Sequence, residues 1–209
     1  DCDQRSDSWH EFRAVRITAS RFAIPLGHGY PYNPEKAPAK PPYSVHRAIS
    51  AFLWPNGPHY PNGGATRRGG GPACRWGTIN EPRVQTIVQR LLQQDLEAQG
   101  ALEVRFEYPG TLIIRGMEWV AVSVDGLCHV VWPPKPPAAA AATDTGETET
   151  ILLEFKCTYS KGMYEDSEGG IPLAYYDQIQ GSMGFLRAHG MPISRCVFGT
   201  WSRERTRVA

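Results

Sequence analysis

Two opposite charges stand inside an otherwise apolar segment, TILLEFKCT, at residues 150–158. Side chains of a β-strand alternate between two faces, so in a strand Glu154 and Lys156 would share one face while Phe155 points to the other. Charged side chains are rarely buried unless they are paired or functional. The pair therefore marks either the solvated face of an edge strand or a functional site on a core strand.

A third charged residue, Asp125, ends the apolar segment AVSVD directly before a glycine. An Asp-Gly pair often forms a hairpin turn. If the two segments are neighbours in one sheet, however, Asp125 converges with Glu154 and offers oxygen donors suited to Mg²⁺ or Mn²⁺, with Lys156 beside them. Such a site can cleave a phosphodiester, because the metal lowers the pKa of a bound water and offsets phosphate charge while the lysine orients the water.

Two further polar residues lie on predicted helices. Glu81 precedes Val84 by three residues and falls on the apolar stripe of its helix. It is either the capping-box partner of Thr78 or a third carboxylate directed at the sheet. Gln178 lies at the edge of a helix face, where it is either an ordinary solvated glutamine or a polar group within reach of the sheet.

The elements that must position these residues are a helix, a run of strands and a second helix between strands. The first helix is predicted to begin at the capping box of Thr78, with Pro82 in its first turn, and to end near Gly100. Turn residues separate four strands that suggest an antiparallel meander, at 102–108, 111–115, 119–124 and 127–132. A strand at 150–158, a helix at 173–189 and a strand at 193–201 follow. This order predicts one α/β (α+β) domain over residues 1–209, with a mixed central β-sheet flanked by helices.

Two segments interrupt this pattern. Residues 25–73 are rich in proline and glycine and are predicted to be mostly loop, with one short helix at 43–54. Residues 133–149 (PPKPPAAAAATDTGETE) read as an exposed linker.

Composition excludes several classes of protein. The chain has 209 residues, 41% hydrophobic and 21% charged, which suits one globular domain and excludes a collagen, a coiled coil or a fully disordered chain. It carries 22 basic and 21 acidic residues, so a nucleic acid would have to be held by local basic clusters. The candidates for such contacts are Arg16, Arg21, Arg67, Arg68, Arg203, Arg205 and Arg207. No apolar run approaches the roughly 20 residues that span a bilayer, and five cysteines without paired spacing suggest a reducing compartment. We therefore expect a soluble intracellular protein with no membrane partner.

Five segments, in this order, resemble the lambda-type exonuclease family, the YqaJ-like viral recombinase branch of the PD-(D/E)XK nucleases. They are SWHEFRAVRITAS (8–20), RWGTINE (75–81), SVDGL (123–127), LLEFKC (152–157) and AYYDQIQGSM (174–183). The resemblance implies a restriction-endonuclease-like core over the whole chain. Val124 stands where the family usually has proline, which should leave a metal site intact.

The resemblance also implies roles for the residues singled out above. Asp125 and Glu154, with the backbone carbonyl of Phe155, would hold two Mg²⁺ or Mn²⁺ ions, and Lys156 would serve the attacking water. Glu81 and Gln178 would complete the metal and water shell, with Glu81 counted among the metal ligands.

Three residues near or beyond the amino-terminal motif would form a pocket for a 5′-terminal phosphate: Arg13, Ser20 and Ser123. A guanidinium with two hydroxyls is a good phosphate clamp. Without the motif, Arg13 would read as a surface arginine on a helix and Ser20 as a helix N-cap.

The function that the resemblance implies is a Mg²⁺-dependent deoxyribonuclease that digests double-stranded DNA from linear ends, 5′ to 3′, in recombination or viral DNA processing. Its implied partners are duplex DNA, a single-strand-annealing protein and further copies of the chain. Two alternatives remain at this point. One is an endonuclease or RNA-cleaving nuclease of the same fold, and the other is a catalytically inactive nucleic-acid-binding module.

Overall fold

A computed structural model describes residues 7–14, 16–23, 26, 72–114, 116–134, 146–159, 171–202 and 206–208. The chain divides into two compact units. The first unit comprises Asp1–Gly70, Gly110–Ser123 and Gly162–His189, and the second comprises Gly71–Pro109, Val124–Lys161 and Gly190–Ala209. Each unit is assembled from segments that are distant in the sequence.

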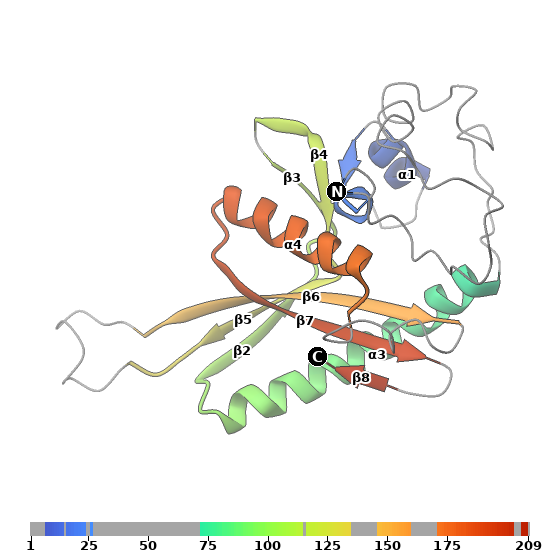
Figure 1. The fold of residues 1–209 in the computed structure, drawn as a ribbon. Coiled ribbons are helices and arrows are strands. Elements are labelled where there is room, and N and C mark those ends of the chain that lie inside the picture. The colour runs from blue at the N-terminus through green and yellow to red at the C-terminus, as the bar shows by residue number, and fades with distance from the viewer. Residues whose placement is uncertain are drawn as a thin grey trace, which may run out of the picture. The chain divides into compact units, whose positions relative to one another are not determined.

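The second unit is built on a mixed five-stranded sheet with strand order β2-β5-β6-β7-β8 (Figure 1). Strands β6 and β7 are parallel, and the other neighbours are antiparallel. The strands are β2 (Glu103–Glu107), β5 (Gly126–Val131), β6 (Thr148–Thr158), β7 (Ile193–Ser202) and β8 (Thr206–Val208). The prediction of a mixed sheet flanked by helices is confirmed.

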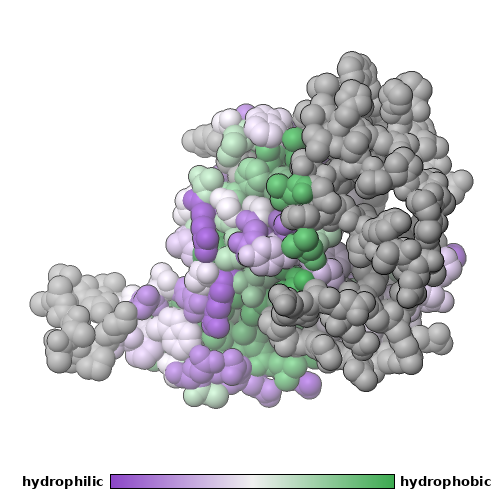
Figure 2. Space-filling view, in the orientation of Figure 1, coloured by the Kyte–Doolittle hydropathy of each residue, from purple (hydrophilic) through white to green (hydrophobic). Residues whose placement is uncertain are grey.

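Helix α3 (Pro72–Ala98) packs along one face of this sheet, mainly against β6 (Figure 1). Its buried row repeats every fourth residue, at Val84, Val88, Leu92 and Leu96, as the periodicity of an amphipathic helix requires. Most residues on the exposed side of the helix are polar, with Ile79 and Leu91 as apolar exceptions. Figure 2 shows purple, hydrophilic residues among others at the lower edge of the view, where Figure 1 draws this helix.

The predicted start of this helix is wrong. The helix begins at Pro72, so Thr78 and Glu81 lie inside it and do not form a capping box at its first turn. Pro82 is likewise an interior residue. It is exposed, so its ring displaces no core side chain, and the helix continues beyond it, with Thr86 Oγ1 donating to the Pro82 carbonyl at 2.9 Å.

Strand β6 has the predicted alternation. Ile151, Leu153 and Phe155 belong to the core cluster under α3, so the even-numbered residues, including Glu154 and Lys156, face the other side of the sheet. The strand pairs with β5 on one side and β7 on the other. The alternative of a solvated edge strand is therefore wrong, because β6 is central and Glu154 is only 1% exposed.

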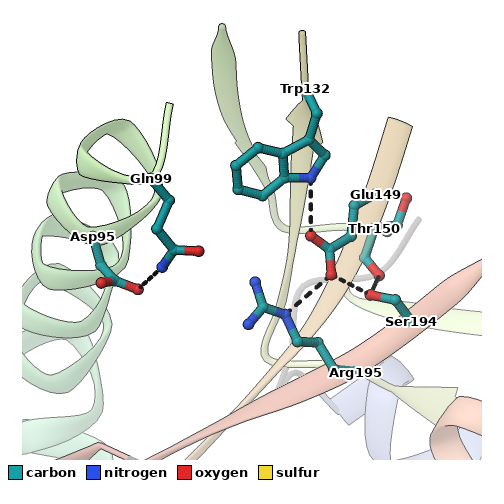
Figure 3. A network of polar contacts seen from close by, with 7 residues as sticks. All are labelled: Asp95, Gln99, Trp132, Glu149, Thr150, Ser194 and Arg195. Atoms are coloured by element: carbon teal, nitrogen blue, oxygen red, sulfur yellow. Dashed lines mark hydrogen bonds and ion pairs between the residues drawn. The ribbon is translucent and has the colours of Figure 1, made fainter. Parts of the chain in front are cut away.

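The amino-terminal end of β6 is tied down by a polar network around Glu149 (Figure 3). The Glu149 carboxylate accepts hydrogen bonds from Trp132 Nε1 at 3.2 Å, Ser194 Oγ at 2.7 Å and Arg195 Nε at 3.0 Å. Figure 3 shows these side chains converging on Glu149 from the neighbouring strand ends. The predicted linker over 133–149 is thus too long, since Thr148 and Glu149 belong to the strand.

The first unit contains a three-stranded sheet of order β1-β4-β3. Its strands are β1 (Ile17–Thr18), β3 (Thr111–Ile114) and β4 (Met117–Ser123), and its helices are α1 (Asp7–Ala14), η1 (Ala19–Arg21) and α4 (Leu173–Ala188). Helix α4 packs on η1, where the rings of Phe22 and Phe185 stack with centroids 5.1 Å apart. Gly181 allows this approach, because a Cβ there would overlap the Phe22 ring.

The predicted meander is wrong in its pairing. Strands β3 and β4 pair with each other, but β5 pairs with β2 and β6 in the other sheet. At Asp125-Gly126 the chain therefore passes from the three-stranded sheet to the five-stranded sheet and does not form a hairpin turn. Gly126 is required by close packing, since a Cβ there would lie 3.0 Å from the Tyr108 ring and 3.2 Å from Leu153.

One predicted helix cannot be compared with the structure, because residues 43–54 lie outside the described residues. Two observed strands, β1 and β8, were not predicted. No helix in the described part of the chain is both long and apolar enough to span a membrane.

Candidate active site

Asp125 is held against strand β6 by the pairing of β5 with β6. In that register Gly126 lies opposite Leu153. Asp125, which precedes Gly126, therefore lies beside Glu154 and Phe155, which follow Leu153 on β6. The backbone N–H of Phe155 donates to Asp125 Oδ2 at 2.6 Å. A hydrogen bond of this length fixes the carboxyl group at the point where β6 carries its two charges.

Glu154 and Lys156 point to the same face of β6 and contact each other. The Lys156 ammonium donates to Oε1 of Glu154. The glutamate is 1% exposed and the lysine 22% exposed, so the pair lies at the boundary between protein interior and solvent. The predicted convergence of Asp125, Glu154 and Lys156 is confirmed.

The electrostatics of this cluster are dominated by burial. Loss of solvation, followed by the negative charge of Glu154, raises the pKa of Asp125 to about 8, against the opposing effects of Lys156 and the Phe155 N–H. Glu81 also raises the pKa of Asp125. The site therefore gathers carboxylates around a single ammonium, an arrangement that disfavours full ionisation in the absence of another cation.

This donor set fits a divalent metal ion. Asp125 and Glu154 offer carboxylate oxygens, Phe155 follows Glu154 on β6 and offers a backbone carbonyl, and hard oxygen ligands are those that Mg²⁺ and Mn²⁺ prefer. Among the described residues, no group of three or more His, Cys, Asp or Glu side chains is arranged to hold a metal. A third ligand would therefore have to come from the Phe155 carbonyl, from water, or from Glu81 after a shift of its side chain.

Glu81 and Gln178 are placed differently. Glu81 is half-buried on α3, in the second unit, and its charge acts on Asp125. This favours the interpretation of Glu81 as a carboxylate directed at the sheet. Gln178 is half-buried on α4, in the first unit, and its role in the metal and water shell stays a prediction.

Cys196 is a neighbour of the charge cluster that sequence reasoning missed. It lies opposite Leu152 on β7, and burial, followed by the charges of Glu154 and Asp125, raises the pKa of its thiol. The thiol is therefore protonated at neutral pH and contributes packing instead of a metal ligand or nucleophile. No sequence signal marked it, because its place depends on the pairing of β6 with β7.

Arg13, Ser20 and Ser123 meet in the first unit as predicted. Arg13 Nη1 donates to Ser123 Oγ at 2.6 Å, and Nη2 donates to Ser20 Oγ at 3.1 Å. Nη2 also lies 3.4 Å from Thr18 Oγ1. The guanidinium is thus surrounded by hydroxyl groups, which can serve as donors to an anion. Arg13 lies on α1 and is half-buried, so it is a helix arginine whose guanidinium is hydrogen-bonded within the protein. Ser20 lies within η1, after its N-cap residue Thr18.

Three neighbours of this pocket were not predicted. Thr18 is 1% exposed, and its Oγ1 lies 3.2 Å from Ser20 Oγ. Thr111 Oγ1 lies 2.8 Å from Ser123 Oγ. The indole of Trp9 donates to Thr111 Oγ1 at 2.9 Å and lies under the Arg13 guanidinium, with Cζ 4.3 Å from the ring centroid. Threonines are ordinary strand residues, so their types alone carried no signal.

Among the other arginines predicted to contact nucleic acid, the structure describes the side-chain contacts of Arg16. Arg16 donates to the Glu118 and Phe12 carbonyls and stacks on the Phe12 ring, so it joins α1 to β4. Arg67, Arg68, Arg203 and Arg205 lie outside the described residues, as do the side chains of Arg21 and Arg207.

The fold of the chain is that of solved alkaline exonuclease structures. It is similar to an alkaline exonuclease (LHK-Exo) from Laribacter hongkongensis, with a TM-score of 0.52, 17% identity, and coverage of 98% of this chain and 80% of that chain. A structure of LHK-Exo in complex with dAMP gives a TM-score of 0.56 with the same identity and coverage.

The family follows from a separate comparison. The model of the YqaJ-like viral recombinase domain matches residues 8–186, so the chain belongs to this family. The match spans both compact units and includes every residue of the two clusters described above. No curated protein sequence is significantly similar to the chain.

Proposed function

We propose that the chain is a metal-dependent nuclease that hydrolyses phosphodiester bonds of double-stranded DNA, working 5′ to 3′ from linear ends. The observation that carries this proposal is the ion pair between buried Glu154 and half-buried Lys156 on a central strand, beside Asp125. Family membership and the fold of an alkaline exonuclease support it. Buried charges of this kind destabilise a protein, so their presence favours a catalytic function over a structural one.

Asp125 and Glu154 would hold Mg²⁺ or Mn²⁺, with the Phe155 carbonyl as a further ligand. When bound there, the metal supplies a water of lowered pKa and offsets the charge of the scissile phosphate. Lys156 would orient that water and stabilise the negative charge that develops on the phosphate, because its ammonium is held at the site by Glu154. Burial strengthens these interactions by excluding bulk water.

The pocket of Arg13, Ser20 and Ser123 would bind the terminal 5′-phosphate. Its guanidinium and hydroxyl groups are matched to phosphate oxygens, and the Trp9 ring contacts the guanidinium, with Cζ 4.3 Å from the ring centroid. Such a pocket would select a DNA end and thereby favour an exonuclease over an enzyme that cleaves internally.

The experiment compares end-labelled linear duplex, covalently closed duplex and linear RNA, each with and without Mg²⁺. We expect Mg²⁺-dependent release of nucleotides from linear DNA alone. Lys156→Ala should be inactive, while Arg90→Ala, which removes an exposed charge from α3, should retain activity. Cleavage of the closed duplex would indicate an endonuclease, degradation of RNA would revise the substrate, and DNA binding without cleavage would support an inactive binding module.

A further inference from the structure

The pocket around Arg13 continues into a chain of hydrogen bonds that leads away from the guanidinium. Ser123 Oγ receives the Arg13 N–H at 2.6 Å and lies 2.8 Å from Thr111 Oγ1. Thr111 Oγ1 in turn receives the Trp9 indole N–H at 2.9 Å. These contacts connect α1 with the paired ends of β3 and β4, where Thr111 lies directly opposite Ser123.

The donor and acceptor capacity of each group limits the direction in which these hydrogen bonds can be donated. Arginine and indole nitrogens only donate, a hydroxyl has one proton and two acceptor sites, and a phosphate oxygen only accepts. If Ser123 gives its proton to a phosphate, the bond between Ser123 and Thr111 must be donated by Thr111. Phosphate binding therefore selects one direction, from Trp9 through Thr111 to Ser123 and then to the anion.

We propose that Thr111 is a positioning residue of the 5′-phosphate pocket, acting through Ser123. Its hydroxyl lies within hydrogen-bond distance of Ser123 Oγ and donates to it, so that the serine proton is left for the phosphate. Hydrogen bonds in such a series polarise one another and strengthen the last donor. This inference rests on the proposed function, because it concerns the affinity of the same pocket for a terminal phosphate.

Trp9 supports the pocket at two points. Its ring lies under the Arg13 guanidinium, and its N–H occupies one acceptor site of Thr111. With that site filled, Thr111 keeps one acceptor site and one proton for Ser123. The same indole thereby contacts both the cation and the hydroxyl series of the pocket.

The test measures kcat/KM on duplexes that carry a 5′-phosphate or a 5′-hydroxyl, and takes the ratio of the two. Thr111→Val keeps the shape of the side chain and removes its hydroxyl. We expect the ratio to fall about two- to tenfold, the range that one lost hydrogen bond gives. Thr111→Ser keeps the hydroxyl and should retain the ratio within about twofold. Thr148→Val, at an exposed position of β6, is the matched control and should leave the ratio unchanged.

The outcomes separate this inference from the proposed function. A merely structural role of Thr111 would lower both rates together and leave the ratio unchanged, which would overturn the inference, as would equal losses in the valine and serine variants. If wild type cleaves linear DNA without preferring the 5′-phosphate, the pocket and the inference both fail while the nuclease stands. If wild type does not cleave, the proposed function fails. Should the valine variant not fold, as judged by circular dichroism, Thr111→Ala carries the same expectation.

Discussion

Replacing Asp125 by asparagine should stabilise the metal-free protein while abolishing cleavage. Asparagine has nearly the same shape, and its Oδ1 can still accept the Phe155 N–H that now lies 2.6 Å from Asp125 Oδ2. Its amide N–H group can also donate to the Glu154 carboxylate, which an ionised aspartate would repel. The substitution therefore removes a buried charge without creating a cavity or an unpaired amide.

The size of the effect follows from the pKa of the aspartate. Burial and Glu154 raise it from 3.8 to about 8, so between these pH values the folded protein retains a proton that the unfolded chain has released. Stability of the wild type must then fall as pH rises through this range, since the folded state binds more protons. At about 1.4 kcal/mol per pH unit, Asp125 would lower the free energy of unfolding by up to about 4 kcal/mol at pH 7. Asparagine does not titrate, so its advantage should be near zero at pH 4 and grow towards pH 8.

Urea denaturation of both proteins in EDTA, at intervals from pH 4 to pH 8, measures this difference directly. Asp95→Asn, an exposed position on α3 where Gln99 bonds the carboxylate, is the control for the same chemical change outside the charge cluster. Mg²⁺ should stabilise the wild type more than Asp125→Asn, because the metal needs the carboxylate. A difference between wild type and Asp125→Asn that does not change with pH, or that shrinks as pH rises, would refute the assignment of Asp125 as a buried, destabilising carboxyl.

Three further outcomes are expected. Lys156→Ala should lower kcat at least about a hundredfold, and in EDTA it should lower the free energy of unfolding by about 1–3 kcal/mol, because the buried Glu154 loses its ammonium donor; Mg²⁺ should reduce that second loss. Arg13→Ala should abolish a preference of roughly ten- to a hundredfold for 5′-phosphorylated over 5′-hydroxyl ends. Initial rates on both substrates measure this preference, with Arg83→Ala as the control. If the variant retained the preference, Arg13 would not belong to the phosphate pocket. Gly199→Ala should destabilise by about 1–3 kcal/mol, because its Cβ would lie 2.7 Å from Val88 Cγ2, whereas Gly184→Ala, with open space around it, should not; equal melting temperatures for the two variants would contradict the packing of α3 on β7.

Periodic patterns within one element were readable from the sequence. The alternation in β6 predicted that Glu154 and Lys156 share one face, and the apolar row of α3 predicted its buried side, because both depend only on the local geometry of strand and helix. The place of Asp125 was also predicted, but only on the condition that its segment and β6 are neighbours. That condition is met by the pairing of β5 with β6.

Pairing between elements was not readable. An Asp-Gly step reverses the chain in a hairpin, yet the same two residues can carry it from β4 in one sheet to β5 in another. The choice depends on which strands bury the apolar side chains of β5, and these come from distant parts of the sequence. The capping box at Thr78 failed for a related reason: its spacing is compatible with a helix start, but the residues before it continue the helix to Pro72. The role of Thr111 was not predicted, because its contact with Ser123 exists only through the register of β3 and β4.

The position of the charges on a central strand explains how the protein can tolerate them. Strand β6 is held by backbone pairing on both sides and by an apolar face packed on α3, so a local movement that would bring water to Glu154 must also break sheet or core contacts. The carboxylates are therefore kept in a site of low dielectric constant, where they attract a cation more strongly than in water. The burial that lowers the stability of the metal-free protein is the same property that would make a divalent ion bind at this site. For this reason stability and metal affinity should change in opposite directions when Asp125 is neutralised.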